Sequence, residues 1–268
     1  RLPAAAREAR DVMDTYRRNK GNLPRLLQRL QEDSEIWAPV LRNGDVLLEA
    51  VSDLSQIAHE GDYVNTIIGA KQVLFPREEH MLRFTLDGRV EVEPVYEKRK
   101  RVVFGIRSCD VSGINFAERF FTKGGLSDPY FAWRREHTTL ISIACLEPGE
   151  FCFCVCCEGG PGLESGFDVQ LTDIGEAYLA EVDSSRGRAV VEQNRLLFEE
   201  ASPQDVRREK ELLTEAQQKF ARSTFVAYMM RRISRAEVPE GFWQWLSDRC
   251  LGCAGCRYVC PTCTCFDV

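Results

Sequence analysis

Arg101-Val-Val-Phe-Gly-Ile106 is a compact apolar segment that ends three residues before Cys109. An apolar run of this length is typical of a strand buried on both faces of a sheet. A helical pattern follows it, for which Asp110 is a suitable N-terminal cap. A second apolar run, Thr138 to Ala144, ends at Cys145. Strand, helix and strand of these lengths form a βαβ unit, whose two strands run parallel and are usually adjacent.

The two cysteines that end these strands are expected to lie side by side at the carboxyl edge of the sheet, where open α/β sheets bind ligands. The loop after Cys145 is rich in glycine and sulfur and can fold back over that edge. We expect a four-thiolate metal site there, made by Cys109, Cys145, Cys152 and Cys154. Cys156 and Cys157 are alternative ligands. The simpler interpretation is that Cys109 and Cys145 are small buried hydrophobic residues.

The rest of the chain predicts a mixed sheet with flanking helices. Residues 1–33 have helical spacing, including Val12, Met13 and Tyr16, and a second helix carries Leu26, Leu27 and Leu30. Extended segments are expected at residues 37–40, 45–48, 73–75 and 81–84. Two hairpins are predicted, one turning at Asp87-Gly88 and one over residues 167–182 that closes the sheet. One polar helix should run from Ser202 through Met230.

The last nineteen residues hold six of the twelve cysteines. Four of them, Cys250, Cys253, Cys256 and Cys260, have the spacing C-x2-C-x2-C-x3-C-P, which is the bacterial ferredoxin run for an iron–sulfur cluster. A structural zinc site is the alternative. Cys263 and Cys265 follow and could complete the site. An aromatic patch at residues 242–246 precedes the run and either shields a cluster or packs on the preceding helix.

These patterns predict an α/β fold: a mixed sheet with a βαβ unit, then a helical linker and a ferredoxin-like [4Fe-4S] segment. Four parts are expected. They are an N-terminal helical element (1–34), an α/β domain with the cysteine-rich sheet edge (35–200), a helical linker (201–246) and a cluster segment (247–268).

The net charge, the apolar runs and the cysteine and histidine content limit the classes of function open to this protein. The net charge of −6 argues against nucleic-acid binding, and no apolar run is long enough to cross a bilayer. The cysteines form tight groups, which fits metal binding in the cytoplasm better than a secreted disulfide scaffold. The three histidines lack metal-ligand spacing, so sulfur should hold any metal.

Motifs for substrate chemistry are missing from the sequence. Gly159-Gly160-Pro161-Gly162 lacks the spacing of a phosphate-binding loop, and no dinucleotide fingerprint or Ser/His/Asp set is present. Non-catalytic electron transfer is therefore the leading hypothesis. The alternatives are a thiol-based sulfur or disulfide reductase that uses Cys109, Cys145 and Cys152–Cys157, and a zinc-stabilised interaction module.

The chain resembles a known family from about residue 66 to its end: the iron–sulfur beta subunits of cytoplasmic NAD(P)-linked nickel–iron hydrogenases, also called sulfhydrogenases. It is also similar to the A-type subunits of anaerobic sulfite reductases. The resemblance is carried by four stretches: residues 73–79 with 82–84; residues 104–110; the segment from 128–130 through 152–154 and 160–161 to 166–168; and residues 250–267.

The resemblance implies an electron-relay subunit with [4Fe-4S] clusters, of which one or two are ligated within this stretch. The implied partners are a catalytic subunit of nickel–iron hydrogenase or sulfite reductase type and a flavin-containing NAD(P)-binding subunit. The sequence departs from the family at Cys156-Cys157, where members often have Ser-Met. Family members also continue to a second ferredoxin run with a further cluster, whereas this sequence stops at Val268, so we expect it to be truncated.

Overall fold

The computed structural model describes residues 13–265 except 60, 87, 89, 98, 124 and 158. Within them, eight strands form one sheet in the order β10-β1-β9-β8-β7-β6-β2-β3. The central strands β2 (Glu35–Arg42), β6 (Arg101–Ile106), β7 (Thr138–Ile143) and β8 (Val169–Asp173) run parallel to their neighbours in that group. The α/β fold with a βαβ unit is therefore confirmed, while the ferredoxin-like segment remains a prediction.

Antiparallel strands complete the sheet on both sides. β3 (Asp45–Val51) pairs with β2, and β9 (Ala177–Val182) pairs with β8. Outside β9 lie β1 (Asp14–Asn19) and β10 (Glu199–Glu200). The hairpin predicted over residues 167–182 is confirmed, but it does not close the sheet because these two strands extend beyond it.

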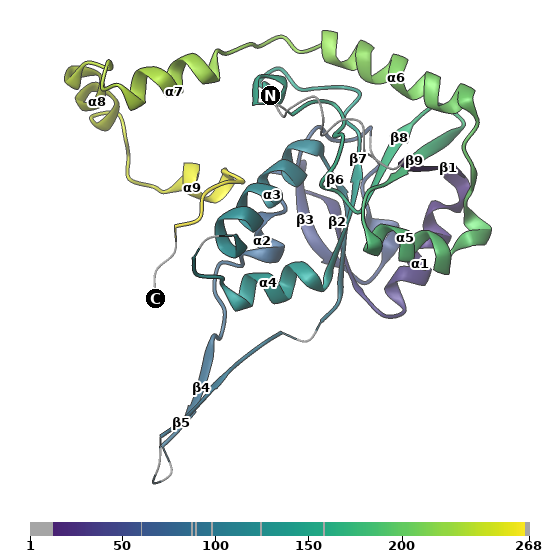
Figure 1. The fold of residues 1–268 in the computed structure, drawn as a ribbon, viewed down its shortest axis with the longest axis horizontal. Helices are drawn as coiled ribbons and strands as arrows, with labels where there is room; N and C mark the ends of the chain where they lie inside the picture. The colour runs from purple at the N-terminus through teal and green to yellow at the C-terminus, as the bar shows by residue number, and fades with distance from the viewer. Residues whose placement is uncertain are drawn as a thin grey trace.

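Helices cover both faces of the sheet, as Figure 1 shows. The α1 (Leu23–Gln31) and α5 (Ser185–Gln193) helices pack on one face, where Val102 and Phe104 of β6 point. The other face is covered by α2 (Lys71–Leu74), α3 (Ser108–Thr122) and α4 (Pro129–Glu136), and it receives Val103 and Ile106. All six residues of β6 are buried, as expected for a central strand.

The remaining elements are short or lie outside the sheet. The single-turn helices are η2 (Lys20–Asn22), η3 (Leu54–Gln56), η4 (Cys154–Cys157) and η5 (Arg195–Leu197). A separate hairpin, β4 (Leu82–Thr85) and β5 (Glu91–Pro94), projects from the body. The sequence predicts this hairpin, although Asp87 in its turn lies outside the described residues.

Several sequence-based predictions are wrong in detail. Residues 14–19 form strand β1 and not a helix, while residues 1–12 lie outside the described residues. Residues 71–74 form helix α2, so the strand expected at residues 73–75 is absent. The linker contains α6 (Pro203–Gln218) and α7 (Val226–Ser234), separated by an extended segment, in place of one helix. The last two helices are α8 (Glu240–Ser247) and α9 (Gly255–Val259).

A buried carboxyl pair fastens α6 to the sheet. Glu209 of α6 accepts a hydrogen bond from Thr172 Oγ1 at 2.9 Å and shares a hydrogen bond with Glu181 of β9. Gln170 donates to the other side of Glu181 at 2.6 Å. Burial, together with the charge of Glu181, raises the pKa of Glu209 to about 8. At neutral pH Glu209 therefore keeps a proton, which an ordinary glutamate would lose, and this proton forms the hydrogen bond between the two carboxyl groups.

We expect Glu209→Gln to reduce the pH dependence of stability. The pKa of Glu209 is about 8 in the folded protein but 4.5 ordinarily, so the folded state binds more protons between these values. The free energy of unfolding of the wild type should consequently fall as pH rises through this window, whereas the amide has no proton to lose. At pH 8 the variant should be more stable than the wild type by about 1–3 kcal/mol. Urea denaturation at pH 5 and pH 8 measures this.

The matched control is Glu211→Gln, which changes an exposed carboxylate on the same helix. Equal pH slopes for Glu209→Gln and the wild type would contradict the shared proton.

Candidate metal centre

The ends of β6 and β7 place two of the predicted cysteines. Gly105 interrupts the register between Phe104 and Ile106, with a φ of +78°. A Cβ atom there would lie 2.9 Å from the Tyr63 hydroxyl, so this bulge requires glycine. Helix α3 then begins at Ser108, which places Cys109 in its first turn.

The prediction that Asp110 caps this helix is wrong. Its N-terminal cap is Arg107, without a side-chain hydrogen bond, and Asp110 lies inside the helix. The Asp110 carboxylate instead accepts a hydrogen bond from the backbone N–H of Ala70 at 3.1 Å. Asp110 therefore anchors the segment that enters α2.

The loop after β7 folds back over the sheet edge, as the sequence predicts. The backbone N–H of Cys145 donates to Pro161 O at 2.7 Å, and the Ser108 hydroxyl donates to Gly160 O. Within the loop, Cys152 N–H donates to Gly149 O at 3.0 Å. These bonds return residues 160–161 to the ends of β6 and β7 and hold the intervening cysteines above them.

All four predicted sheet-edge cysteines come together. Burial raises the pKa of Cys109 to about 12 and that of Cys154 to about 11, and it also raises the pKa of Cys145. The charges of Cys145 and Cys154 act on Cys109, and that of Cys152 acts on both Cys145 and Cys154. These four thiols from three separate segments are therefore electrostatic neighbours.

The alternative cysteines differ from this group. Cys156 accepts a hydrogen bond from the backbone N–H of Thr224 at 3.2 Å, so its thiol is directed to the linker. Cys157 is exposed. Neither is among the main influences on the pKa values of Cys109, Cys145 and Cys154.

Two polar residues beside the thiols were missed from the sequence. The guanidinium of Arg107 donates to Tyr63 O at 2.7 Å, to Val64 O at 3.0 Å and to Ala144 O at 3.5 Å. This buried cation acts against the burial that raises the pKa of Cys145. Asn65 Nδ2 lies 3.5 Å from the Cys109 sulfur and can donate a hydrogen bond to it. No spacing rule singles out either residue.

The donor set at the sheet edge consists of cysteine side chains alone. Among the described residues, no three or more His, Cys, Asp or Glu side chains are grouped as ligands of one ion. Zinc needs thiolate sulfurs at about 2.3 Å, which draws them close to one another. A cubane cluster lies between its four ligands and separates them more widely. Four neighbouring thiols form an all-sulfur donor set, which suits either a zinc ion or an iron–sulfur cluster.

The C-terminal cysteines lie on a short helix and the loop before it. Cys250 and Cys253 precede α9, Cys256 lies within it and Cys260 forms its C-cap. All but Cys260 are exposed. Downstream, a hydrogen bond from the backbone of Cys265 lowers the pKa of Cys263, and the Lys71 cation contributes.

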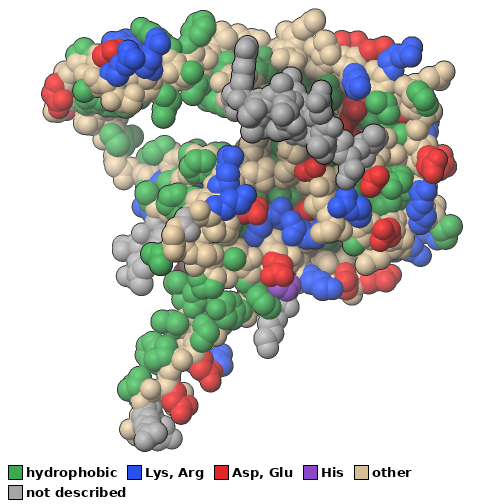
Figure 2. Space-filling view, viewed as in Figure 1, with side chains coloured by type: hydrophobic (Ala, Val, Ile, Leu, Met, Phe, Trp, Pro, Cys, Tyr) green, Lys and Arg blue, Asp and Glu red, His purple; other side chains and the backbone are tan. Residues whose placement is uncertain are grey.

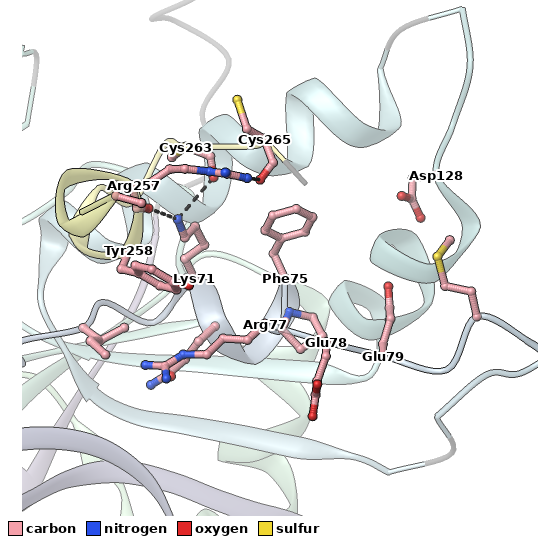
Figure 3. A pocket seen from close by; sticks show the side chains of 15 residues that line it. Lys71, Phe75, Arg77, Glu78, Glu79, Asp128, Arg257, Tyr258, Cys263 and Cys265 are labelled. Carbon is pink, nitrogen blue, oxygen red and sulfur yellow. Dashed lines mark hydrogen bonds between the residues drawn. The ribbon is translucent and has the colours of Figure 1, made fainter. Parts of the chain in front are cut away.

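Lys71 of α2 clamps this segment to the α/β body. Its ammonium donates to Arg257 O at 3.1 Å, Cys260 O at 2.9 Å and Cys263 O at 3.2 Å. Figure 3 shows Lys71 reaching the carbonyls of Arg257 and Cys263 at the edge of a cavity of about 570 Å³ that Phe75 also lines. Because α9 ends with unpaired carbonyls, a cation at this position stabilises its C-terminus.

A glycine allows a second close contact. A Cβ atom at Gly113 of α3 would lie 2.5 Å from Cβ of Pro261. Gly113 is four residues after Cys109, so both lie on one face of α3, one turn apart. Pro261 follows Cys260 directly. The Cys260 end of the C-terminal cysteine group therefore lies against α3, one helical turn from Cys109.

The aromatic patch predicted near the cysteine run lies on α8. The exposed fraction of its side chains runs from 38% at Trp243 to 49% at Trp245. The rings of Phe242 and Trp245 stack with their centres 5.9 Å apart. The patch thus packs largely on itself within the described chain.

Taken together, these observations describe an α/β protein with two groups of cysteines, one at the sheet edge and one near the C-terminal end of the described residues. The chain is 29% identical over 245 residues to sulfhydrogenase 2 subunit beta of Pyrococcus furiosus, a match that covers 91% of this chain and 71% of that protein. The resemblance inferred from the sequence is thereby confirmed as a similarity to a sulfhydrogenase beta subunit. No protein-family model matches the chain. Among the described residues, no helix is both long and apolar enough to span a membrane.

Replacing Gly113 with Ala should loosen the C-terminal segment without destabilising α3. The added methyl group collides with Pro261, whereas alanine is favoured over glycine inside a helix by about 1 kcal/mol. Amide hydrogen exchange in residues 256–263 should become roughly tenfold faster, which corresponds to about 1.4 kcal/mol of local opening. Lys71→Met should have the same effect by removing three donated hydrogen bonds.

Gly125→Ala is the matched control, since a methyl group there meets nothing within 4 Å. Unchanged exchange in both Gly113→Ala and Lys71→Met would show that the segment is not docked on α2 and α3.

Proposed function

We propose that this chain is an iron–sulfur electron-transfer subunit of an oxidoreductase complex. In this role it relays single electrons between a flavin-bearing, NAD(P)H-linked partner and a catalytic subunit of hydrogenase or sulfur/sulfite reductase type. The observation that carries the proposal is the convergence of Cys109, Cys145, Cys152 and Cys154 from three segments of the chain. The similarity to a sulfhydrogenase beta subunit supports it.

Two sets of thiols would hold the clusters. The first is the sheet-edge set just named. The second is Cys250, Cys253, Cys256 and Cys260, with Cys263 or Cys265 as an alternative fourth ligand. Bound [4Fe-4S] clusters would supply one-electron transfer at both positions.

The surrounding residues suit this task. Arg107 and Lys71 place a positive charge beside each cysteine group, and both are fixed by backbone carbonyls. Positive charge near thiolates favours the more negative, reduced state and raises the reduction potential. Cys145 is buried, and Cys109, Cys152 and Cys154 are half-buried, which limits the access of water to the first group.

Thiol catalysis is less well supported. A reactive cysteine needs a lowered pKa and access to solvent. Burial raises the pKa of Cys109 and Cys154 well above the ordinary value, which makes them poor nucleophiles as free thiols. No residue of this chain then needs to touch a substrate, which favours a non-catalytic subunit. The tight grouping of its cysteines favours a cytoplasmic location.

Cysteine replacements separate the two proposed clusters. Cys253→Ser should remove the signal of one cluster from the EPR spectrum of the reduced protein and leave the signal of the second cluster, free of magnetic interaction with the first. Cys109→Ser or Cys145→Ser should remove the second signal and leave the first, because the ligand sets do not overlap. The anaerobically purified protein should be brown and contain iron and acid-labile sulfide.

Cys157→Ser is the matched control and should keep both signals, because Cys157 is exposed and outside the thiol group. A colourless, zinc-loaded protein would contradict the proposal. Loss of the same signal in Cys253→Ser and Cys109→Ser would mean that the division into two sites is wrong. Rapid alkylation of Cys109 and Cys145 in the purified protein would favour thiol chemistry instead.

A further inference from the structure

The projecting β4–β5 hairpin has one apolar and one polar face. Cross-strand pairs join Leu82 to Pro94 and Phe84 to Val92, so these four side chains lie on the same face. Alternation places Arg83, Thr85, Glu91 and Glu93 on the opposite face. Towards the tip, Leu86 and Val90 continue the apolar series by the same alternation.

The apolar face is open to solvent. Leu82 is 54% exposed, Phe84 is 62% exposed and Leu86 is 76% exposed. Figure 2 shows hydrophobic side chains running along the hairpin, with charged ones on its other side. A two-stranded hairpin with an uncovered apolar face is at best marginally stable in water.

The base of the hairpin is held firmly by α4. The Tyr130 hydroxyl donates to Met81 O, and Trp133 Nε1 donates to Glu97 O at 2.7 Å. The ring of Tyr96 packs 5.3 Å from that of Tyr130 and 5.7 Å from that of Trp133. The hairpin is thus presented on a fixed base, which lowers the entropy lost when a partner binds.

We infer that this hairpin is a docking arm that inserts into an apolar groove of a partner subunit. The inference rests on the proposed function, since it assigns a binding surface to one of the proteins that exchange electrons with this chain. Met81, directly before β4, lines the same cavity as Cys263 and Cys265. A partner seated on the arm would therefore lie beside the C-terminal cysteine segment.

The size of the arm favours a groove over a second copy of this chain. The apolar face spans five positions on each side of the hairpin (82–86 and 90–94), so it is roughly 17 Å long and 10 Å wide, or about 170 Å². A stable interface buries about 800 Å² on each side, so two hairpins packed face to face cover too little. A groove also encloses the two edges of the apolar face and so buries more of the arm, while the charged face stays in water.

Charge argues against a lipid surface. Elements that lie on membranes usually have basic polar faces, whereas this polar face carries Glu91 and Glu93 against Arg83. The net charge of the whole chain is −6. An anionic bilayer would repel such a protein.

The test is the composition of the native complex purified anaerobically through a tag on this chain. Phe84→Asp combined with Val92→Asp should lower the yield of the co-purifying partner subunit by at least tenfold, while the iron content and EPR signals stay at wild-type levels. Leu196→Asp is the matched control, because Leu196 is 90% exposed on η5, away from the hairpin, and should keep the complex.

A photo-crosslinking residue at position 84 of the otherwise native chain provides a second measurement. Mass spectrometry should identify its crosslinks as peptides of one partner subunit, with none from position 196. Retention of the complex by the double variant would overturn the inference, and so would crosslinks to a second copy of this chain or to lipid. A wild-type protein that shows no EPR signals of iron–sulfur clusters would instead contradict the proposed function.

Discussion

Parallel pairing of β6 with β7 is the constraint on which the rest of the structure depends. Because parallel strands end at the same edge, the residues after Ile106 and Ile143 must meet there. The bulge at Gly105 directs the chain into α3, so that Cys109 starts a helix beside Cys145. The sulfur-rich loop then closes over this edge through backbone bonds to residues 160 and 161. Cysteines that are far apart in the sequence therefore come together at one edge of the sheet.

Helix α3 gives this site its relation to the C-terminal cysteines. Its first turn carries Cys109, and its second turn offers the bare backbone of Gly113 to Pro261. Lys71, from α2 on the same face of the sheet, donates hydrogen bonds to the carbonyls at the end of α9. A rigid helix and a single cation thus hold two cysteine groups as neighbours, although about 100 residues of chain separate Cys154 from Cys256. An electron relay needs this kind of fixed proximity between its centres.

The parts of this arrangement that follow local rules could be predicted from the sequence. The apolar runs ending at Cys109 and Cys145 define the βαβ unit, and the Asp-Gly turn defines the projecting hairpin. Strand β1 could not be predicted, because its partners in β9 lie some 160 residues away and its short segment also fits helical spacing. Lys71 and Arg107 were missed for a related reason: each is a single basic residue whose role exists only once distant carbonyls surround it.

The most direct test of two adjacent iron–sulfur sites is the EPR spectrum of the fully reduced, anaerobically purified protein. If both sites are filled and separated by one turn of α3, the two centres should interact magnetically. The spectrum should then differ from the sum of those recorded for Cys253→Ser and Cys109→Ser. A spectrum equal to that sum, or one that shows a single centre, would contradict the account.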